Sequence, residues 1–199
     1  MIDTPRSPRV WQLLSAPIVA LALGACASTP AEPNTGPDRT RTGEETDATI
    51  ADYPFTRDQL RAAFVVGTRI DLRIEDHGKV HYEELAVTAA DQTGCTIATR
   101  IVTEEGHLVA DKGSQTRTWA EIQADESHPR AETVISEGKL QSFMGDTDTW
   151  LYIYTTTDAQ GHALQSFHHY AKKLPGPPVL ETDTVDGQIV KRTFMVGRR

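Results

Sequence analysis

The chain has 199 residues, with 20 Lys and Arg against 28 Asp and Glu, a formal net charge of -8, and two cysteines. This acidic balance argues against a nucleic-acid partner, because a negative surface repels phosphates. No apolar stretch reaches the roughly 18 residues of a membrane span, and two cysteines cannot build a disulfide scaffold or a four-thiolate metal site. The length allows one domain with appendages.

The N-terminus has the features of a secretory signal. Two arginines lie within the first nine residues, the run from Val10 to Leu23 is mainly apolar, and the small residues Gly24 and Ala25 follow. A basic start, an apolar run and small residues before a cleavage site are typical of a signal peptide. We therefore predict a signal peptide over residues 1–25, and the alternative is a short membrane anchor that is never cleaved.

The segment Leu23-Gly24-Ala25-Cys26 resembles the lipobox of bacterial lipoproteins. The resemblance implies that the Cys26 thiol carries a diacylglycerol, that the peptide is cut just before it, and that the new amine is acylated as well, with palmitate as a typical acyl group. Ala27 stands where an aspartate would resemble an inner-membrane retention signal. The resemblance therefore implies the outer membrane, facing the periplasm or the surface, or the plasma membrane exterior in a source without an outer membrane.

Residues 26–52 are predicted to be the lipidated cysteine and a disordered acidic tether. Pro, Gly, Thr and acids dominate residues 27–52, where Ile50 is the only large apolar residue. Such a segment cannot bury enough surface to offset its ordering entropy. The periodic apolar pattern begins after it, so we predict a β-rich globular domain over residues 53–199.

The first half of this domain predicts one short helix followed by strands. Thr56 opens a capping box ahead of apolar residues at helical spacing, which predicts a helix near 56–65. Residues 69–75 alternate strictly, as a strand with one buried face does. A phase break at Glu83 and Glu84 predicts a bulge in the next strand. Further strands are expected at 80–89, 95–103 and 107–110, with a loop at 111–117.

The second half begins with another capping box and continues as strands. Thr118 opens this box, and the helix is expected to end before His128 and Pro129. The acidic segment 146–148 is expected to be a turn, and Asp186-Gly187 is expected to close a C-terminal hairpin. The predicted strands cover residues 131–136, 139–144, 149–157, 162–171, 179–185 and 188–196.

These elements predict a mainly β fold. Nine or ten short strands with turns every 8–12 residues and two short helices leave no room for parallel crossovers, so an antiparallel meander is expected. A strongly curved sheet, or half-barrel, with the helices over its concave side is the first expectation, and a closed barrel or sandwich is the alternative. The outline is similar in architecture to LolA/LolB-type lipoprotein carriers of the bacterial envelope, and this similarity assigns no functional residue.

The residues that carry chemistry form no recognised motif. His77 and His81 flank one turn, whereas His168 and His169 are adjacent in a strand and so point to opposite faces, which disfavours one shared metal site. Cys95 has no neighbouring base and is expected to be a small buried hydrophobe. We therefore predict no catalytic residue, no metal and no cofactor, with Cys26 as the only modified site.

Three functions stay open, and two tryptophans bear on them. The first function is a non-catalytic envelope lipoprotein that binds protein or cell wall and helps to assemble the surface. The second is a carrier or sensor of an apolar ligand, a lipid or a lipoprotein, in a concave sheet. The third is a hydrolase that uses scattered acids and histidines. Trp119 and Trp150 are expected to pack in the core or to contact each other rather than to line a cavity. The lack of a catalytic motif ranks the binding module first and predicts that the protein is not an enzyme.

Overall fold

The computed structural model describes residues 49–199, which belong to one compact unit. The predicted signal peptide over residues 1–25, the lipidation site Cys26 and most of the predicted tether lie outside the described residues. Neither of the two α-helices in the described part of the chain is long and apolar enough to cross a bilayer.

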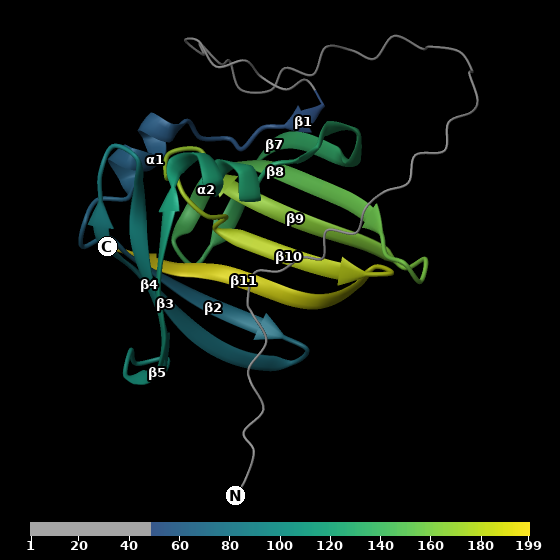
Figure 1. Ribbon diagram of the computed structural model, residues 1–199. Helices are drawn as coiled ribbons and strands as arrows, with labels where there is room; N and C mark the ends of the chain where they lie inside the picture. The colour runs from purple at the N-terminus through teal and green to yellow at the C-terminus, as the bar shows by residue number, and fades with distance from the viewer. Residues whose placement is uncertain (1–48) are drawn as a thin grey trace, which may run out of the picture. The chain divides into compact units, whose positions relative to one another are not determined.

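Nine antiparallel strands form one sheet in the order β5-β4-β3-β2-β11-β10-β9-β8-β7 (Figure 1). The chain runs outward from β2 to the edge strand β5, crosses to the opposite edge at β7, and returns strand by strand to β11, which pairs with β2. Because β5 and β7 are not paired with each other, the sheet stays open, as expected for a curved meander. The strands are β2 (Arg69–Asp76), β3 (Lys79–Ala90), β4 (Gly94–Val102), β5 (Leu108–Thr118), β7 (Thr133–Ser142), β8 (Gly145–Thr157), β9 (Ala163–Ala171), β10 (Leu180–Val185) and β11 (Gln188–Arg198).

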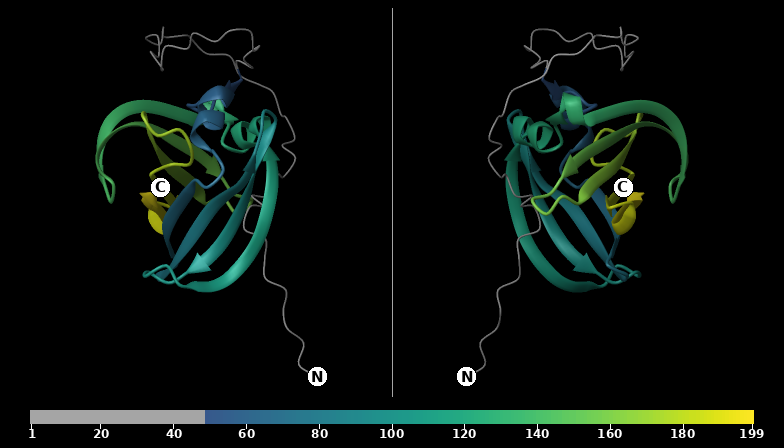
Figure 2. Two further views of the ribbon diagram at one scale, coloured as in Figure 1. Left: turned by 90° about the vertical axis from the view of Figure 1, so that its left-hand side faces the viewer. Right: turned by 90° about the vertical axis from the view of Figure 1, so that its right-hand side faces the viewer.

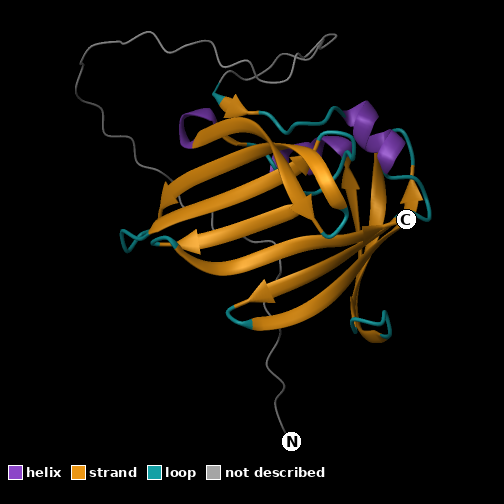
Figure 3. Cartoon of the chain, turned by 180° about the vertical axis from the view of Figure 1, so that it is seen from behind, coloured by secondary structure: helices purple, strands orange, loops and turns teal. Residues whose placement is uncertain are grey.

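Two short helices lie inside the curve of the sheet. They are α1 (Arg57–Ala63) and α2 (Trp119–Asp125), and a 3-10 turn, η1 (Arg130–Glu132), follows them. Both predicted capping boxes are present, since the side chains of Thr56 and Thr118 each accept a hydrogen bond from the backbone N–H three residues on. Figure 2 shows the two arms of the sheet with the helices between them, and Figure 3 shows the helices gathered along one end of the strands.

An aromatic core fills the concave face next to the helices. The side chains of Tyr152 and Tyr170 are fully buried and pack edge to face, with ring centroids 5.3 Å apart. Trp119 and Trp150 are both part of this packing, and each contacts a different phenylalanine. The predicted core role is therefore confirmed for Trp119, and Trp150 is partly buried against the core.

The N-terminal boundary of the ordered domain differs from the prediction. Ile50–Ala51 forms the short strand β1, which pairs with β6 (His128–Pro129), and Ala51 is 1% exposed. These two residues lie within the segment whose composition predicted a tether. Backbone pairing between short segments leaves no compositional trace, so the sequence pattern missed it.

The predicted loop at 111–117 is wrong, because these residues belong to the edge strand β5. Every residue of β5 except one is exposed, so this strand has no buried face and shows no apolar alternation. An edge strand with polar residues on both faces resembles a loop in the sequence, although its backbone pairs fully on one side.

The strand boundaries in the β7–β8 hairpin also differ from the prediction. One continuous strand, β7, replaces the two strands expected at 131–136 and 139–144. The predicted turn at 146–148 lies within β8 instead, and the hairpin turn is at Phe143 and Met144. The outer part of this hairpin extends past the end of β9, where solvent exposure removes the alternation that marks a strand.

The bulge predicted at Glu83 and Glu84 is also wrong. Pairing of β2 with β3 is continuous there, and the irregularity lies further along β3, between Val87 and Ala89 on the β4 side. The apparent phase break arises because β3 carries apolar residues on both faces and places Glu83 inward, opposite the buried Leu72.

Candidate functional site

Charged side chains line the part of the concave face that the helices leave uncovered. Cross-strand pairing puts His168 beside Tyr152 on one side and beside Glu181 on the other. Directly paired residues share a face of the sheet, and Tyr152 is in the core, so His168 and Glu181 point inward. The next inward row contains Ser166, Asp183 and Lys191. We call the set Glu126, Ser166, His168, Glu181, Asp183 and Lys191 the charged wall.

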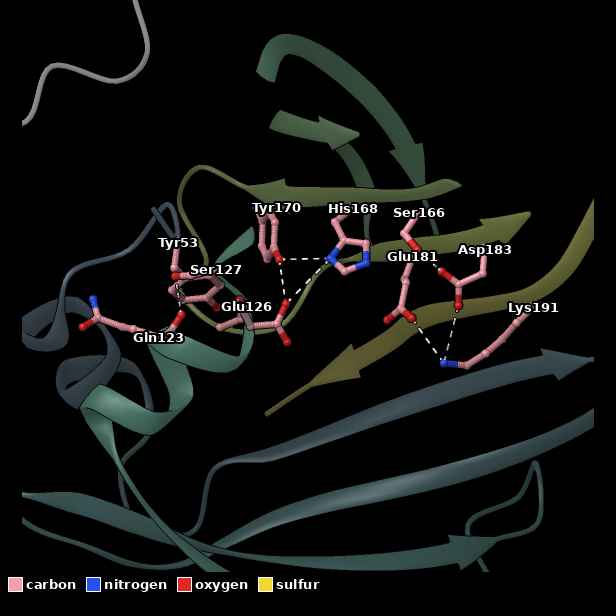
Figure 4. Close-up of polar contacts among 11 residues, drawn as sticks. Tyr53, Gln123, Glu126, Ser127, Ser166, His168, Tyr170, Glu181, Asp183 and Lys191 are labelled. Carbon is pink, nitrogen blue, oxygen red and sulfur yellow. Dashed lines mark hydrogen bonds and ion pairs between the residues drawn. The ribbon is translucent and has the colours of Figure 1, made fainter. Parts of the chain in front are cut away.

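Glu126 enters the charged wall from the end of α2, at the C-cap position. The helix is held in place because the Gln123 side chain donates a 2.8 Å hydrogen bond to the backbone oxygen of Phe55. The Glu126 carboxylate accepts a 2.8 Å hydrogen bond from the Tyr170 hydroxyl (Figure 4). The register of α2 against the N-terminal segment therefore decides where this carboxylate lies.

One ring nitrogen of His168 faces this pair. His168 Nδ1 lies 3.1 Å from the Tyr170 hydroxyl and 3.7 Å from Glu126 Oε2 (Figure 4). The His168 side chain is 11% exposed, so the contacts operate where water screens them weakly. The Tyr170 hydroxyl on β9 and the Glu126 carboxylate at the end of α2 thus fix the orientation of the imidazole.

Burial and neighbouring charges have opposite effects on the pKa values of His168 and Glu126. Burial disfavours the charged imidazolium, but the contact with the Glu126 carboxylate and the negative charge of Glu181 outweigh it, so the pKa of His168 is raised. Burial likewise disfavours the Glu126 carboxylate, but its contacts with His168 and Tyr170 outweigh burial and lower the pKa of Glu126. Nearby His128 stays neutral, because burial first and the charge of His168 second lower its pKa to about 4.

Lys191 neutralises the other end of the charged wall. Its Nζ lies 3.2 Å from Glu181 Oε1 and 3.9 Å from Asp183 Oδ2. The Ser166 hydroxyl donates a 2.6 Å hydrogen bond to Asp183 Oδ1 (Figure 4). Burial of Lys191 disfavours its charge, but the two carboxylates outweigh that cost and raise its pKa.

Three side chains of the charged wall form a candidate cation site. Ligand atoms of His168, Glu181 and Asp183 all lie within 4.8 Å of one another. Imidazole nitrogen and carboxylate oxygen are donors that suit zinc and other divalent transition metals.

A second inward ion pair lies on the other arm of the sheet. Glu83 is only 7% exposed, and its carboxylate contacts the Lys112 ammonium and, at 3.3 Å, His81 Nε2. Two separate segments of the concave face therefore carry buried or partly buried acids that are matched with bases.

The structure separates the histidines that the sequence analysis considered. His168 points inward, whereas His169 pairs with Leu180 on the opposite face, and His77 is exposed beside Asp76. Cys95 is buried, as predicted, and burial raises the pKa of its thiol. The predicted lipidation site Cys26 lies outside the described residues.

The sequence patterns did not indicate most residues of the charged wall. Glu126, Glu181, Asp183 and Lys191 were not singled out, because isolated charges in a sequence are usually solvated. One signal was available for two of them: Glu181 and Asp183 occur at alternate positions of one predicted strand and therefore share a face. Lys191 joins them only through the register shift between Asp183 and Thr184, which the sequence does not show. No protein-family model matches the chain, and a comparison with curated proteins gives no match.

Proposed function

We propose that this chain is a membrane-anchored envelope lipoprotein whose β domain is a non-catalytic binding module, with the charged wall as its ligand-contacting surface. The lipobox-like segment supports the anchor through Cys26. The single observation that carries the binding role is the inward placement of at least five ionisable side chains on an open sheet. Burying charges costs free energy, so a purely structural sheet would place them on its outer face.

The chemistry of the charged wall favours a hydrophilic ligand. The end of the concave face next to the helices is filled by core aromatics, including Tyr152 and Tyr170, and the part beyond them on β9, β10 and β11 presents acids and bases. A ligand with hydrogen-bonding groups of both polarities matches this surface, because each desolvated charge needs a partner. The alternative, a carrier of an apolar ligand, is supported by the openness and curvature of the sheet.

The arrangement of Ser166 favours binding over hydrolysis. An activated serine donates its proton to a neighbouring base, which in serine hydrolases is a histidine. Here the Ser166 hydroxyl donates its proton to Asp183, and not to His168.

The anchor is tested by fatty-acid labelling. In a bacterial host with lipoprotein processing, the wild-type chain should incorporate a clickable fatty acid, and Cys26→Ser should not. Cys95→Ser is the matched control, because Cys95 is the second cysteine of the chain and is buried. Full labelling of Cys26→Ser would contradict the anchor.

The binding role is tested by mass spectrometry of molecules that copurify with the detergent-extracted protein. A polar compound should accompany the wild type and be lost from Lys191→Gln. Arg192→Gln is the matched control, because Arg192 is the next residue of β11 and pairs with residues of the outer face. Copurifying lipids that survive Lys191→Gln would favour the apolar carrier, and equal losses from both variants would contradict a role for the charged wall.

A further inference from the structure

The charged wall contains a preorganised group of metal-binding side chains. His168 on β9 and Glu181 on β10 are direct cross-strand partners, and Asp183 lies two residues along β10 on the same face. Backbone hydrogen bonds of the sheet therefore hold all three positions, and one ligand atom from each lies within 4.8 Å of the other two. A site whose ligands come from regular strands loses little entropy when a ligand binds.

The surroundings of His168 match those of a metal-binding histidine. Such a histidine uses one ring nitrogen for the metal and hydrogen bonds a carboxylate or another oxygen with the second. Here Nδ1 faces Glu126 and the Tyr170 hydroxyl, and the opposite side of the ring faces Glu181 and Asp183 (Figure 4). The outer partners of a metal ligand are therefore already in place.

Lys191 shows that this position holds a cation. Its ammonium contacts Glu181 at 3.2 Å and Asp183 at 3.9 Å, and its side chain is 38% exposed. A long, partly exposed side chain can move out toward solvent at modest cost. Bonds of about 2.0–2.2 Å to zinc would place ligand atoms roughly 3.3–3.6 Å apart. Ligand atoms that now lie within 4.8 Å of one another therefore need to approach by up to about 1.5 Å.

We propose that His168, Glu181 and Asp183 bind one divalent transition-metal ion, with Zn²⁺ as the reference ion, and that the Lys191 ammonium is the internal cation it displaces. Two carboxylates balance the charge of the ion, and three protein ligands leave a fourth position open. This inference rests on the proposed binding role of the charged wall, because a bound ion would offer that open position to a donor atom of the ligand, and the displaced Lys191 ammonium would contact the same ligand beside the ion.

The test is calorimetric titration of ZnCl₂ into the full-length, detergent-extracted protein, after treatment with a chelator. One ion per chain should bind the wild type. Asp183→Asn and His168→Gln should each weaken the affinity at least tenfold. His162→Gln is the matched control, because His162 forms an exposed pair with Asp186 at 2.7 Å and should leave the affinity unchanged.

Lys191→Met distinguishes a metal site from an ordinary ion-pair cluster. Removing the competing ammonium should tighten Zn²⁺ binding about tenfold and increase the thermal stabilisation by Zn²⁺. Co²⁺ should give a visible absorption band in the wild type that Asp183→Asn removes. Thermal melts without metal identify any variant that does not fold. In that case the Zn²⁺ affinity of the wild type is compared with that of Asp183→Asn alone, because this substitution preserves the shape of the side chain.

Three results would overturn the proposal. They are the lack of Zn²⁺ binding by the wild type, binding by Lys191→Met alone, and equal weakening by His162→Gln and Asp183→Asn. Failure of the metal site is distinguishable from failure of the proposed function. A polar ligand that copurifies without metal leaves the binding role intact, whereas Zn²⁺ binding without any copurifying ligand leaves only the metal site.

Discussion

Trp119 offers a direct test of how the helices hold the curved sheet. Its side chain is 3% exposed in the core, packs against Phe64 with ring centroids 6.4 Å apart, and donates a 3.2 Å hydrogen bond from Nε1 to the backbone oxygen of Asp91. It is also the first residue of α2, directly after the capping residue Thr118. A helix of this length has little stability of its own, so packing must hold it.

The expected cost of Trp119→Ala follows from this burial. A tryptophan buries roughly 150–250 Å², which at about 25 cal/mol per Å² corresponds to about 4–6 kcal/mol. The remaining alanine methyl group recovers roughly 1 kcal/mol, so we expect a loss of roughly 3–5 kcal/mol in the free energy of unfolding. Trp119→Phe keeps most of the apolar contact and loses the hydrogen bond, so it should cost roughly 1–2 kcal/mol.

Urea titration of the wild type and both variants, monitored by far-UV circular dichroism, measures these differences. The slope of the free energy against urea should stay constant if only stability changes. A loss of about 1 kcal/mol or less for Trp119→Ala, equal to that for Trp119→Phe, would refute the argument that packing of this side chain holds α2 on the sheet.

Three further predictions concern other parts of the molecule. Gly94→Ala should destabilise the domain by roughly 2–3 kcal/mol in the same assay, because the new Cβ would lie 2.0 Å from the Arg117 backbone oxygen. Gly138→Ala is the control: its new Cβ meets nothing within 4 Å, so its stability should stay within about 0.5 kcal/mol of the wild type. Cys95 should react slowly with iodoacetamide at pH 8 and rapidly in denaturant, because burial raises its thiol pKa; fast reaction of the folded protein would contradict its burial. The hydrogen bond to Asp186 raises the pKa of His162, so the pair should stabilise the fold below the ordinary histidine pKa and lose this effect as pH rises through the raised one. An NMR titration should show the His162 pKa falling in Asp186→Asn, and no change would exclude the pair in solution.

Local chemistry of the chain determined the elements that the sequence predicted correctly. The hydroxyls of Thr56 and Thr118 satisfy helix N-termini within three residues, so both helix starts were predicted from short motifs. The strict alternation of residues 69–75 reflects one buried and one solvated face, and β2 has this pattern. A motif that closes within one turn or one strand needs no distant partner to be recognised.

Strands that are exposed to solvent on both faces could not be predicted from apolar alternation. The edge strand β5 has no buried face, and the outer part of the β7–β8 hairpin pairs beyond the end of β9, so neither shows apolar alternation. Ile50–Ala51 becomes a strand only because β6 lies beside it. In each case the backbone partner, and not the side chains, decides the conformation.

The charged wall depended entirely on tertiary structure. His168, Glu181 and Lys191 come from three strands, and Glu126 comes from a helix end more than 40 positions before His168. A sequence shows that alternate residues share a face, but it does not show which face is concave when both carry charges. The antiparallel register of β9, β10 and β11 and the docking of α2 decided that these charges point inward and meet, because cross-strand neighbours are set by backbone pairing between distant segments.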